Sequence, residues 1–238
     1  MLRRLMMAQP SGGGGGDPYW ANVVSLLHFD GSDGSTTFTD VTGKTWLPNG
    51  TQIDTAQSQW GGASGLFDGS GDYITNNDFA ALEFGSNDFT VEFWIRTTQT
   101  TDYASLIGKA WVGSPYTGGW NIFLNSGSSG PMQIWCADYS TGGPLMTASG
   151  TGYRDGNWHH VAWVREGDDF TLYIDGTSVA TATNSFAFQA ANKLLVIGDD
   201  ITFGPRSYNG HMDDLRITIG VARYTADFTP PTAPFPDS

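Results

Sequence analysis

Apolar and polar residues alternate along several short stretches of this chain, and a half-buried β-strand produces this two-residue period. The clearest case runs from Phe89 to Thr97, where one face collects apolar side chains and the other a mixed set. The stretch therefore predicts a strand with one face in a core. The apolar face holds Phe89, Val91, Phe93 and Ile95, and the opposite face holds Thr90, Glu92, Trp94 and Arg96.

The stretch from Asn157 to Thr183 predicts three antiparallel strands. Residues 158–165 alternate in the same way, and a polar turn separates them from a second alternating run at 170–174. Asp175-Gly176 follows, and because a two-residue hairpin needs positive φ at its centre, Asp-Gly is a strong hairpin signal. The chain is therefore expected to return as a third strand.

Further strands are expected where short apolar runs lie between turn residues. They cover residues 24–29, 36–40, 44–47, 104–108, 120–124, 132–137, 193–198 and 210–219. No window of the sequence predicts a convincing amphipathic helix, and no repeat of fixed period is evident. The 32 glycines, 14 phenylalanines and 9 tryptophans fit short strands joined by tight turns, so the sequence predicts an all-β protein.

A chain of 238 residues is long enough for one large β-sandwich with a tail at each end. Residues 1–18 predict an N-terminal anchor and a flexible glycine-rich tether, since residues 11–16 have almost no side chains to bury. The apolar patch at 5–8 is too short for a secretory signal. The sandwich is expected to span 19–231, and a proline-rich C-terminal tail follows at 232–238.

The formal net charge of −13 limits the partners that this protein can bind. An acidic surface repels phosphate backbones and anionic lipids, so we expect no nucleic acid partner and no membrane insertion. Cys136 is the one cysteine, which excludes an internal disulfide, and its apolar neighbours predict a buried thiol.

Several of these stretches together resemble one family. The order WHHVAWVR at 158–165, a short acidic turn and LYIDG at 172–176 is similar to the laminin-G-like domains of the concanavalin A-like lectin/glucanase superfamily, in the variant common among bacteriophage and bacterial proteins. Supporting stretches are LLHFDG at 26–31, GLFDGSGDYIT at 65–75, DFTVEFWIRTT at 88–98 and GHMDDLRITIGVARYTADFTPP at 210–231. The resemblance implies a two-sheet antiparallel jelly-roll β-sandwich, a fold that serves lectins, hydrolases and structural modules alike.

Glycoside hydrolysis, which occurs on this fold, needs two carboxyl groups that flank the scissile bond. The glutamates Glu83, Glu92 and Glu166 do not form such a pattern, and Glu92 stands alone on its strand face. Strict alternation would point Asp213 and Asp214 to opposite faces, so they are not expected to act as a pair. We therefore expect no catalytic residues and no enzyme activity.

The histidines do not predict a zinc site. His159 and His160 are expected to point to opposite faces of their strand, with one of them hydrogen-bonded inside, and His28 and His211 are isolated in the sequence.

Calcium is the cation that this sequence fits better, because turns rich in Asp and Gly supply hard oxygen ligands. Relatives in the superfamily hold a structural calcium between an early loop and the last strand. By that resemblance the candidate ligands here are Asp30 with Asp213 or Asp214, together with loop carbonyls near Gly65 or Gly69.

A sugar site needs aromatic faces beside hydrogen-bonding side chains. Trp94, Trp135, Trp158 and Trp163 fall within strand patterns and are interpreted as core residues. The carbohydrate-binding candidates therefore come from loops and their edges: Trp111, Tyr116, Trp120, Asn121, Asp199, Asp200 and Arg206.

Three functions remain compatible with the sequence. The favoured one is a non-enzymatic bacteriophage virion protein on the capsid or tail surface, attached to other virion proteins through its N-terminal segment, homo-oligomeric and in contact with host surface glycans. Phage laminin-G-like proteins often open, as here, with a glycine-rich leader and an LLHFDG-like strand. The alternative is a secreted bacterial carbohydrate-binding or adhesion module at the cell surface. The third, a glycoside hydrolase, requires an acid and nucleophile pair that the sequence does not show.

Overall fold

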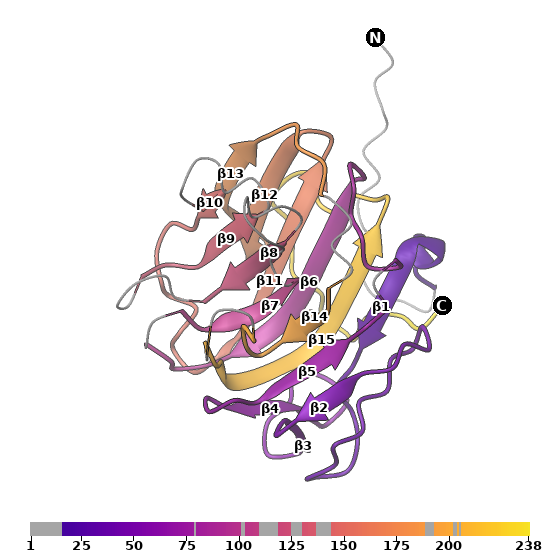
Figure 1. Ribbon diagram of the computed structural model, residues 1–238, viewed down its shortest axis with the longest axis vertical. Helices are drawn as coiled ribbons and strands as arrows, with labels where there is room; N and C mark the ends of the chain where they lie inside the picture. Colours follow the sequence, from indigo (N-terminus) through magenta and orange to yellow (C-terminus); the bar gives the residue numbers. More distant parts are fainter. Residues whose placement is uncertain are drawn as a thin grey trace.

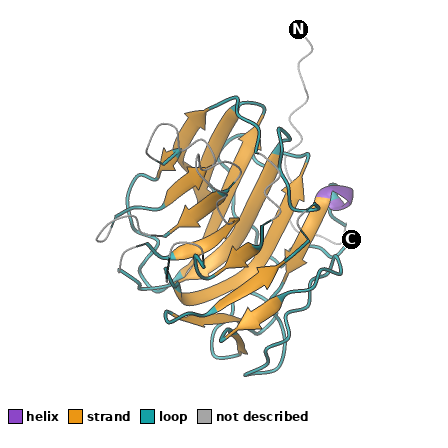
Figure 2. Cartoon of the chain, viewed as in Figure 1, coloured by secondary structure: helices purple, strands orange, loops and turns teal. Residues whose placement is uncertain are grey.

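Two antiparallel β-sheets pack face to face in the computed structural model (Figure 1). It describes residues 16–78, 80–100, 103–109, 119–124, 130–136, 144–188, 193–201, 204 and 206–238. Strands and loops make up almost all of this part of the chain, with one short 3₁₀ helix, η1 (Trp20–Asn22) (Figure 2). None of the described helical structure is long and apolar enough to cross a membrane. The predicted all-β, two-sheet sandwich is confirmed.

The larger sheet has eight strands, and the predicted hairpin at Asp175-Gly176 lies at one edge of it. Its order is β13 (Thr177–Thr183), β12 (Asp169–Ile174), β11 (Trp158–Glu166), β6 (Phe89–Arg96), β15 (Asn209–Ile219), β4 (Ser64–Asp68) and β3 (Gln52–Asp54), with β1 (Val23–Leu27) paired to β15. Asp175 and Gly176 both have positive φ, as the Asp-Gly signal predicts. A side chain at Gly176 would collide with the Phe228 carbonyl, so this turn requires glycine.

The smaller sheet has seven strands. Its order is β10 (Met146–Thr147), β9 (Gln133–Cys136), β8 (Trp120–Phe123), β7 (Ser105–Lys109), β14 (Leu195–Ile197), β5 (Tyr73–Asn76) and β2 (Leu47–Asn49).

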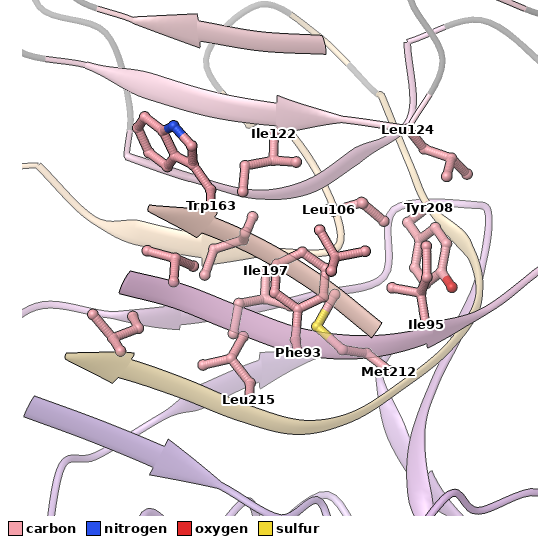
Figure 3. Close-up of a cluster of buried hydrophobic side chains, with 14 of the residues drawn as sticks. Phe93, Ile95, Leu106, Ile122, Leu124, Trp163, Ile197, Tyr208, Met212 and Leu215 are labelled. Atoms are coloured by element: carbon pink, nitrogen blue, oxygen red, sulfur yellow. The ribbon is translucent and has the colours of Figure 1, made fainter. Parts of the chain in front are cut away.

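The main hydrophobic core lies between the two sheets (Figure 3). Phe93 and Ile95 of β6 face Leu106 and Ile122 of the smaller sheet, as the alternation predicts. Cys136 is buried there too, and burial raises the pKa of its thiol well above the usual value. Of the four tryptophans interpreted as core residues, only Trp163 lies in this core. Trp94 is buried on the other face of its sheet, while Trp135 and Trp158 are partly exposed.

Both ends of the described chain pack against the outer face of the larger sheet. The Asp17 carboxylate is buried and bonded to Arg216 and Arg223. Phe235 is buried against Val23 and Leu26 of β1. Asp17 N–H also donates to the carbonyl of Ser238, which joins the two ends.

Candidate functional site

The predicted sugar-binding residues separate into three groups. Trp111 and Tyr116 lie outside the described residues. Trp120 does not form part of a binding surface: its side chain is 2% exposed and stacks on Phe84 in the core, with ring centroids 5.2 Å apart. The reason is strand alternation, because position 120 falls on the inward face of β8.

Asn121, one position on, faces outward from the smaller sheet but is largely buried. Its Oδ1 accepts a hydrogen bond from Ser105 Oγ at 2.9 Å. Its amide lies across Gly108 on the neighbouring strand, where a Cβ would come within 2.6 Å of Nδ2. Asn121 therefore holds β7 and β8 together.

Asp199, Asp200 and Arg206 are brought together, as a predicted site would require. The Asp199 carboxylate accepts hydrogen bonds from the backbone N–H groups of Asp200 and Arg206, each at 2.6 Å, and from Ser207 Oγ at 2.8 Å. Arg206 Nη1 donates to Asp200 Oδ2 at 3.1 Å. Asp199 thus shapes the loop, and Asp200 and Arg206 form the side-chain pair that it positions.

Aromatic and polar side chains gather beside this pair on the outer face of the smaller sheet. The Arg206 guanidinium lies 5.1 Å from the Tyr103 ring centroid and 5.2 Å from that of Phe123. Phe123 is the cross-strand partner of Gln133, whose Oε1 accepts the Trp135 indole N–H at 2.9 Å. We call this set the outer-face patch: Tyr103, Phe123, Gln133, Trp135 and Arg206. Phe123 is 2% exposed, so it supports Tyr103 and Arg206 from below and offers no binding surface of its own.

Sequence reasoning missed four members of the outer-face patch. Trp135 was assigned to the core because it lies in a strand, although alternation places it opposite Ile134 and Cys136, which face inward. Applying the two-residue period to β8 and β9 together would have identified Phe123, Gln133 and Trp135. Tyr103 is 38% exposed, and no pattern in the sequence marks it.

The sequence predicted that Glu92 stands alone on its face of β6. In the structure it lies in a buried ion cluster. Its Oε1 accepts from Arg216 Nη2 at 2.8 Å and its Oε2 from Tyr224 Oη at 2.7 Å. Burial alone would raise the pKa of Glu92, but the charges of Arg216 and Arg223 hold this pKa well below its usual range. The carboxylate is fully buried beneath the chain ends.

The other two glutamates lie apart from Glu92. Glu83 Oε1 is 2.7 Å from Lys109 Nζ, and Glu166 is exposed at the end of β11. The sequence predicted that the three glutamates do not form a pattern on one strand face, and in the structure they lie apart.

Three histidines pair with aspartates. His28 lies between Asp214, 2.6 Å from Nδ1, and Asp237, 2.7 Å from Nε2. Partial burial opposes the shift, but these two hydrogen bonds raise the pKa of His28 to about 9. His159 lies between Asp155 and Asp175, and His211 is 2.8 Å from Asp54.

The expectation of a hydrogen-bonded interior histidine is wrong for His160. It is the buried one, and its ring nitrogens lack hydrogen-bond partners. Its Nε2 is 3.4 Å from the Glu92 carboxylate, too long for a good hydrogen bond.

The three predicted calcium ligands do not form one three-carboxylate site. A β-bulge at Asp214, where φ is 47°, interrupts the alternation, so Met212 and Leu215 both enter the core and both aspartates leave it. The prediction that Asp213 and Asp214 point to opposite faces is therefore wrong. Asp214 is engaged at both oxygens, by His28 and by the Phe235 N–H.

Asp213 and Asp30 keep features that suit a cation. Asp213 Oδ2 accepts the N–H groups of Gln59 and Trp60, but its Oδ1 is buried without a hydrogen-bond partner. Burial, together with the charges of Asp214 and Asp30, raises the pKa of Asp213 to about 7. The Asp30 carboxylate lies over Gly61, where a Cβ would come within 2.1 Å of both its oxygens. Among the described residues, no group of three or more His, Cys, Asp or Glu side chains has the spacing of a metal site.

Fold and motifs place the chain in a known family. The model of the concanavalin A-like lectin/glucanases superfamily, in its laminin-G form, matches residues 68–221, and the chain belongs to this family. Comparison with curated proteins gives no match.

Similar solved structures are distant in sequence and show the fold alone. Domain 4 of AbnA, an extracellular arabinanase from Geobacillus stearothermophilus solved with arabinotriose, is 23% identical, with a TM-score of 0.60 over 84% of this chain and 94% of that one. The binding domain of Paraclostridial Mosquitocidal Protein 1 is 18% identical, with a TM-score of 0.59 over 87% of this chain. The Trypanosoma rangeli sialidase is 13% identical, with a TM-score of 0.56 over 83% of this chain. This chain spans 50% of the mosquitocidal binding domain and 31% of the sialidase.

Proposed function

We propose that this protein is a non-enzymatic component of a bacteriophage virion, a lectin-like sandwich displayed on the capsid or tail that contacts host surface glycans through its outer-face patch. The N-terminal segment attaches it to other virion proteins, and the displayed form is a homo-oligomer. The observation that carries the glycan part is the patch itself. It combines a partly exposed tryptophan, an exposed tyrosine and hydrogen-bonding side chains, the groups that a sugar ring requires.

The outer faces of the two sheets are covered to different extents, and this difference supports the smaller sheet as the one that binds glycans. The outer face of the larger sheet is packed under residues 17–22 and 221–238, and its charged groups are neutralised in the Glu92 cluster. Tyr103 and Ile201 are exposed, and they lie in the loops next to β7 and β14 of the smaller sheet.

Glycan binding is tested by substituting Trp135. Wild-type protein, Trp135→Ala and Trp158→Ala are titrated with arabino-oligosaccharides, chosen because the similar arabinanase domain was solved with arabinotriose, and screened on an array of bacterial surface glycans. Trp158 is a matched control, since it is a partly exposed strand tryptophan on the other sheet. We expect Trp135→Ala alone to weaken binding, by about tenfold or more, as for loss of an aromatic contact. Equal binding by all three proteins would remove the outer-face patch from the proposal.

The virion setting has its own test. Particles purified on a density gradient should contain the protein, and a variant lacking residues 1–15 should fold but no longer copurify with them. The deletion stops before Asp17 because that residue belongs to the buried ion cluster. Particles without the protein would contradict the virion part and leave a secreted carbohydrate-binding module, the function that the similarity to the arabinanase domain favours.

We also propose a structural calcium ion held by Asp30 and Asp213. Its role is to hold the early loop against β15, with backbone carbonyls and water completing its oxygen ligands.

A further inference from the structure

The covering of the larger sheet is incomplete near its β13 edge, where a cavity of about 340 Å³ opens. The cavity lies on the outer face of β11, β12 and β13, which are neighbours in the sheet (Figure 1). Tyr224 and Thr225, from the segment that covers the rest of this face, line one side. A volume at the low end of the range for ligand pockets admits one small polar ligand, such as a sugar ring.

Hydroxyls and carboxylates form the surface of the cavity that a ligand can reach. Strand alternation brings them to one face: Thr171 is the cross-strand partner of Thr181, and Asp169 that of Glu166 on one side and Thr183 on the other. All of these except the half-buried Thr171 are exposed. Thr183 Oγ1 donates to Asp169 Oδ1 at 2.7 Å, which orients that carboxylate.

Two negative charges in the cavity lie directly opposite each other on neighbouring strands. They belong to Glu166 and Asp169, and like charges in this position destabilise a sheet. No Lys, Arg or His is among the residues that line the cavity. The guanidinium of the adjacent Arg165 is held on the other face, 5.1 Å from the Phe170 ring centroid in the core. A positively charged ligand would therefore relieve a repulsion that the described residues leave in place.

Charge and hydroxyls together define the class of ligand. The described residues hold no group of three or more His, Cys, Asp or Glu side chains with the spacing of a metal site. An acidic glycan is repelled by the two carboxylates and by the net charge of −13. A protonated amine only donates hydrogen bonds and a carboxylate only accepts them, whereas threonine hydroxyls do both, as the hydroxyls of a sugar ring do.

From this geometry we infer that the cavity binds an amino sugar with a free, protonated amine. The ammonium group lies between Glu166 and Asp169, and the ring hydroxyls bond to Thr181 and the neighbouring threonines. This cavity and the outer-face patch are on different sheets, so it can bind its ligand whether or not the patch binds a glycan.

The experiment titrates the full chain by calorimetry at mildly acidic pH, where sugar amines are protonated. A glucosamine tetrasaccharide is compared with the same compound after acetylation of every amine and with cellotetraose, which carries a hydroxyl in place of each amine. Tetralysine supplies positive charge without a sugar ring.

The variants separate charge from hydroxyl contacts. Glu166→Gln and Asp169→Asn each remove one charge, and the second keeps an oxygen that can accept the Thr183 hydroxyl. Thr181→Val removes one hydroxyl at nearly constant shape. Asp168→Asn is the matched control, because this side chain is in the same turn and 60% exposed but does not line the cavity. Thermal melting shows that each variant folds, and Glu166→Gln should not lower the melting temperature, since it removes one of two opposed like charges.

We expect the glucosamine probe to bind the wild type about tenfold or more tightly than its acetylated form or cellotetraose, as a charge-assisted hydrogen bond predicts. Glu166→Gln and Asp169→Asn should lose this preference, and Thr181→Val should weaken binding of the glucosamine probe. Asp168→Asn and Trp135→Ala should bind that probe as the wild type does. Added salt should weaken binding, because the attracting charges are exposed.

No binding of the glucosamine probe, or equal binding of its acetylated form, overturns the inference. Tetralysine bound as tightly, with Thr181→Val unaffected, also overturns it and indicates a basic peptide as the occupant. Loss of glycan binding in Trp135→Ala is measured with the neutral arabino-oligosaccharides, so either site can fail while the other stands.

Discussion

Asp17 carries a charge that the interior of the protein requires. Its carboxylate bonds to both Arg216 and Arg223, and with Glu92 it balances two buried positive charges with two negative ones. Burial alone would raise the pKa of Asp17, but the hydrogen bond and the charge of Arg223 lower it. A single residue that the sequence places in a flexible tether therefore decides whether the cluster is neutral.

Asp17→Asn should destabilise the fold by about 3–5 kcal/mol, because it leaves a buried guanidinium without its full countercharge. Urea denaturation at neutral pH measures the free energy of unfolding. Asp168→Asn is the matched control: it removes the same charge from a side chain that is 60% exposed and 3.9 Å from its arginine, so it should change little. A loss in Asp17→Asn no larger than in the control would show that the cluster tolerates the imbalance.

Single residues were also where sequence reasoning reached its limit. Alternation placed Phe93 in the core correctly, because the face of a strand on which a residue lies follows from the residues next to it in the sequence. Asp17 and Glu92 could not be assigned to one cluster in advance, since both bind Arg216, which lies 199 residues from Asp17 and 124 residues from Glu92 in the sequence. Asp200 and Arg206 were found because they lie six positions apart in one loop.

At the scale of elements, the sequence predicted the hairpin at Asp175-Gly176 but not the bulge in β15. Asp175-Gly176 specifies its turn through the φ values that these residues adopt, a local property. The bulge at Asp214 depends on how β15 pairs with both β6 and β1, and it reversed the expected direction of a side chain. The candidate calcium ligands and the outer-face patch both depended on such pairing, which explains why the site was predicted less completely than the fold.

A histidine clamp, formed by His159 with Asp155 and Asp175, ties the Asp175-Gly176 hairpin to the loop that precedes β11. His159 of β11 lies 2.6 Å from Asp175 in the hairpin turn and 3.0 Å from Asp155 in the preceding loop. Burial opposes the shift, but these hydrogen bonds raise the pKa of His159 above its usual value of 6.5. A raised pKa in the folded state adds stability that is fully present below the unfolded pKa and is lost as pH rises through the folded one.

The difference in unfolding free energy between wild type and His159→Gln should therefore be largest below about pH 6.5 and shrink as pH rises above that value. Urea denaturation of both proteins across a pH series isolates this residue, because the other histidines contribute equally to each. A difference that stays constant or grows with pH would contradict the clamp.

At the scale of the whole molecule, segments from both ends of the chain meet on the outer face of the larger sheet. β1 pairs with β15, and Asp214 in β15 bonds both to His28, just after β1, and to the N–H of Phe235. Asp30 and Asp213 belong to the same junction, where the charge of Asp30 acts on Asp213. The junction closes the sandwich, so whatever neutralises its carboxylates acts on the stability of the entire domain.

Calcium should accordingly raise the melting temperature of the whole sandwich relative to protein in a chelator. An ion that binds only the folded state adds about 2.7 kcal/mol when its concentration is 100 times the dissociation constant. Asp213→Asn should abolish the shift, because it removes the charge from the carboxylate whose Oδ1 is buried without a partner. Asp168→Asn, which changes charge far from the junction in the sequence, should keep the shift. Magnesium serves as the ion control, since it accepts flexible mixed-oxygen sites poorly. Identical melting in calcium and chelator would contradict the calcium site and leave the junction to the pairing of β1 with β15 and to the contacts of Asp214 with His28 and Phe235.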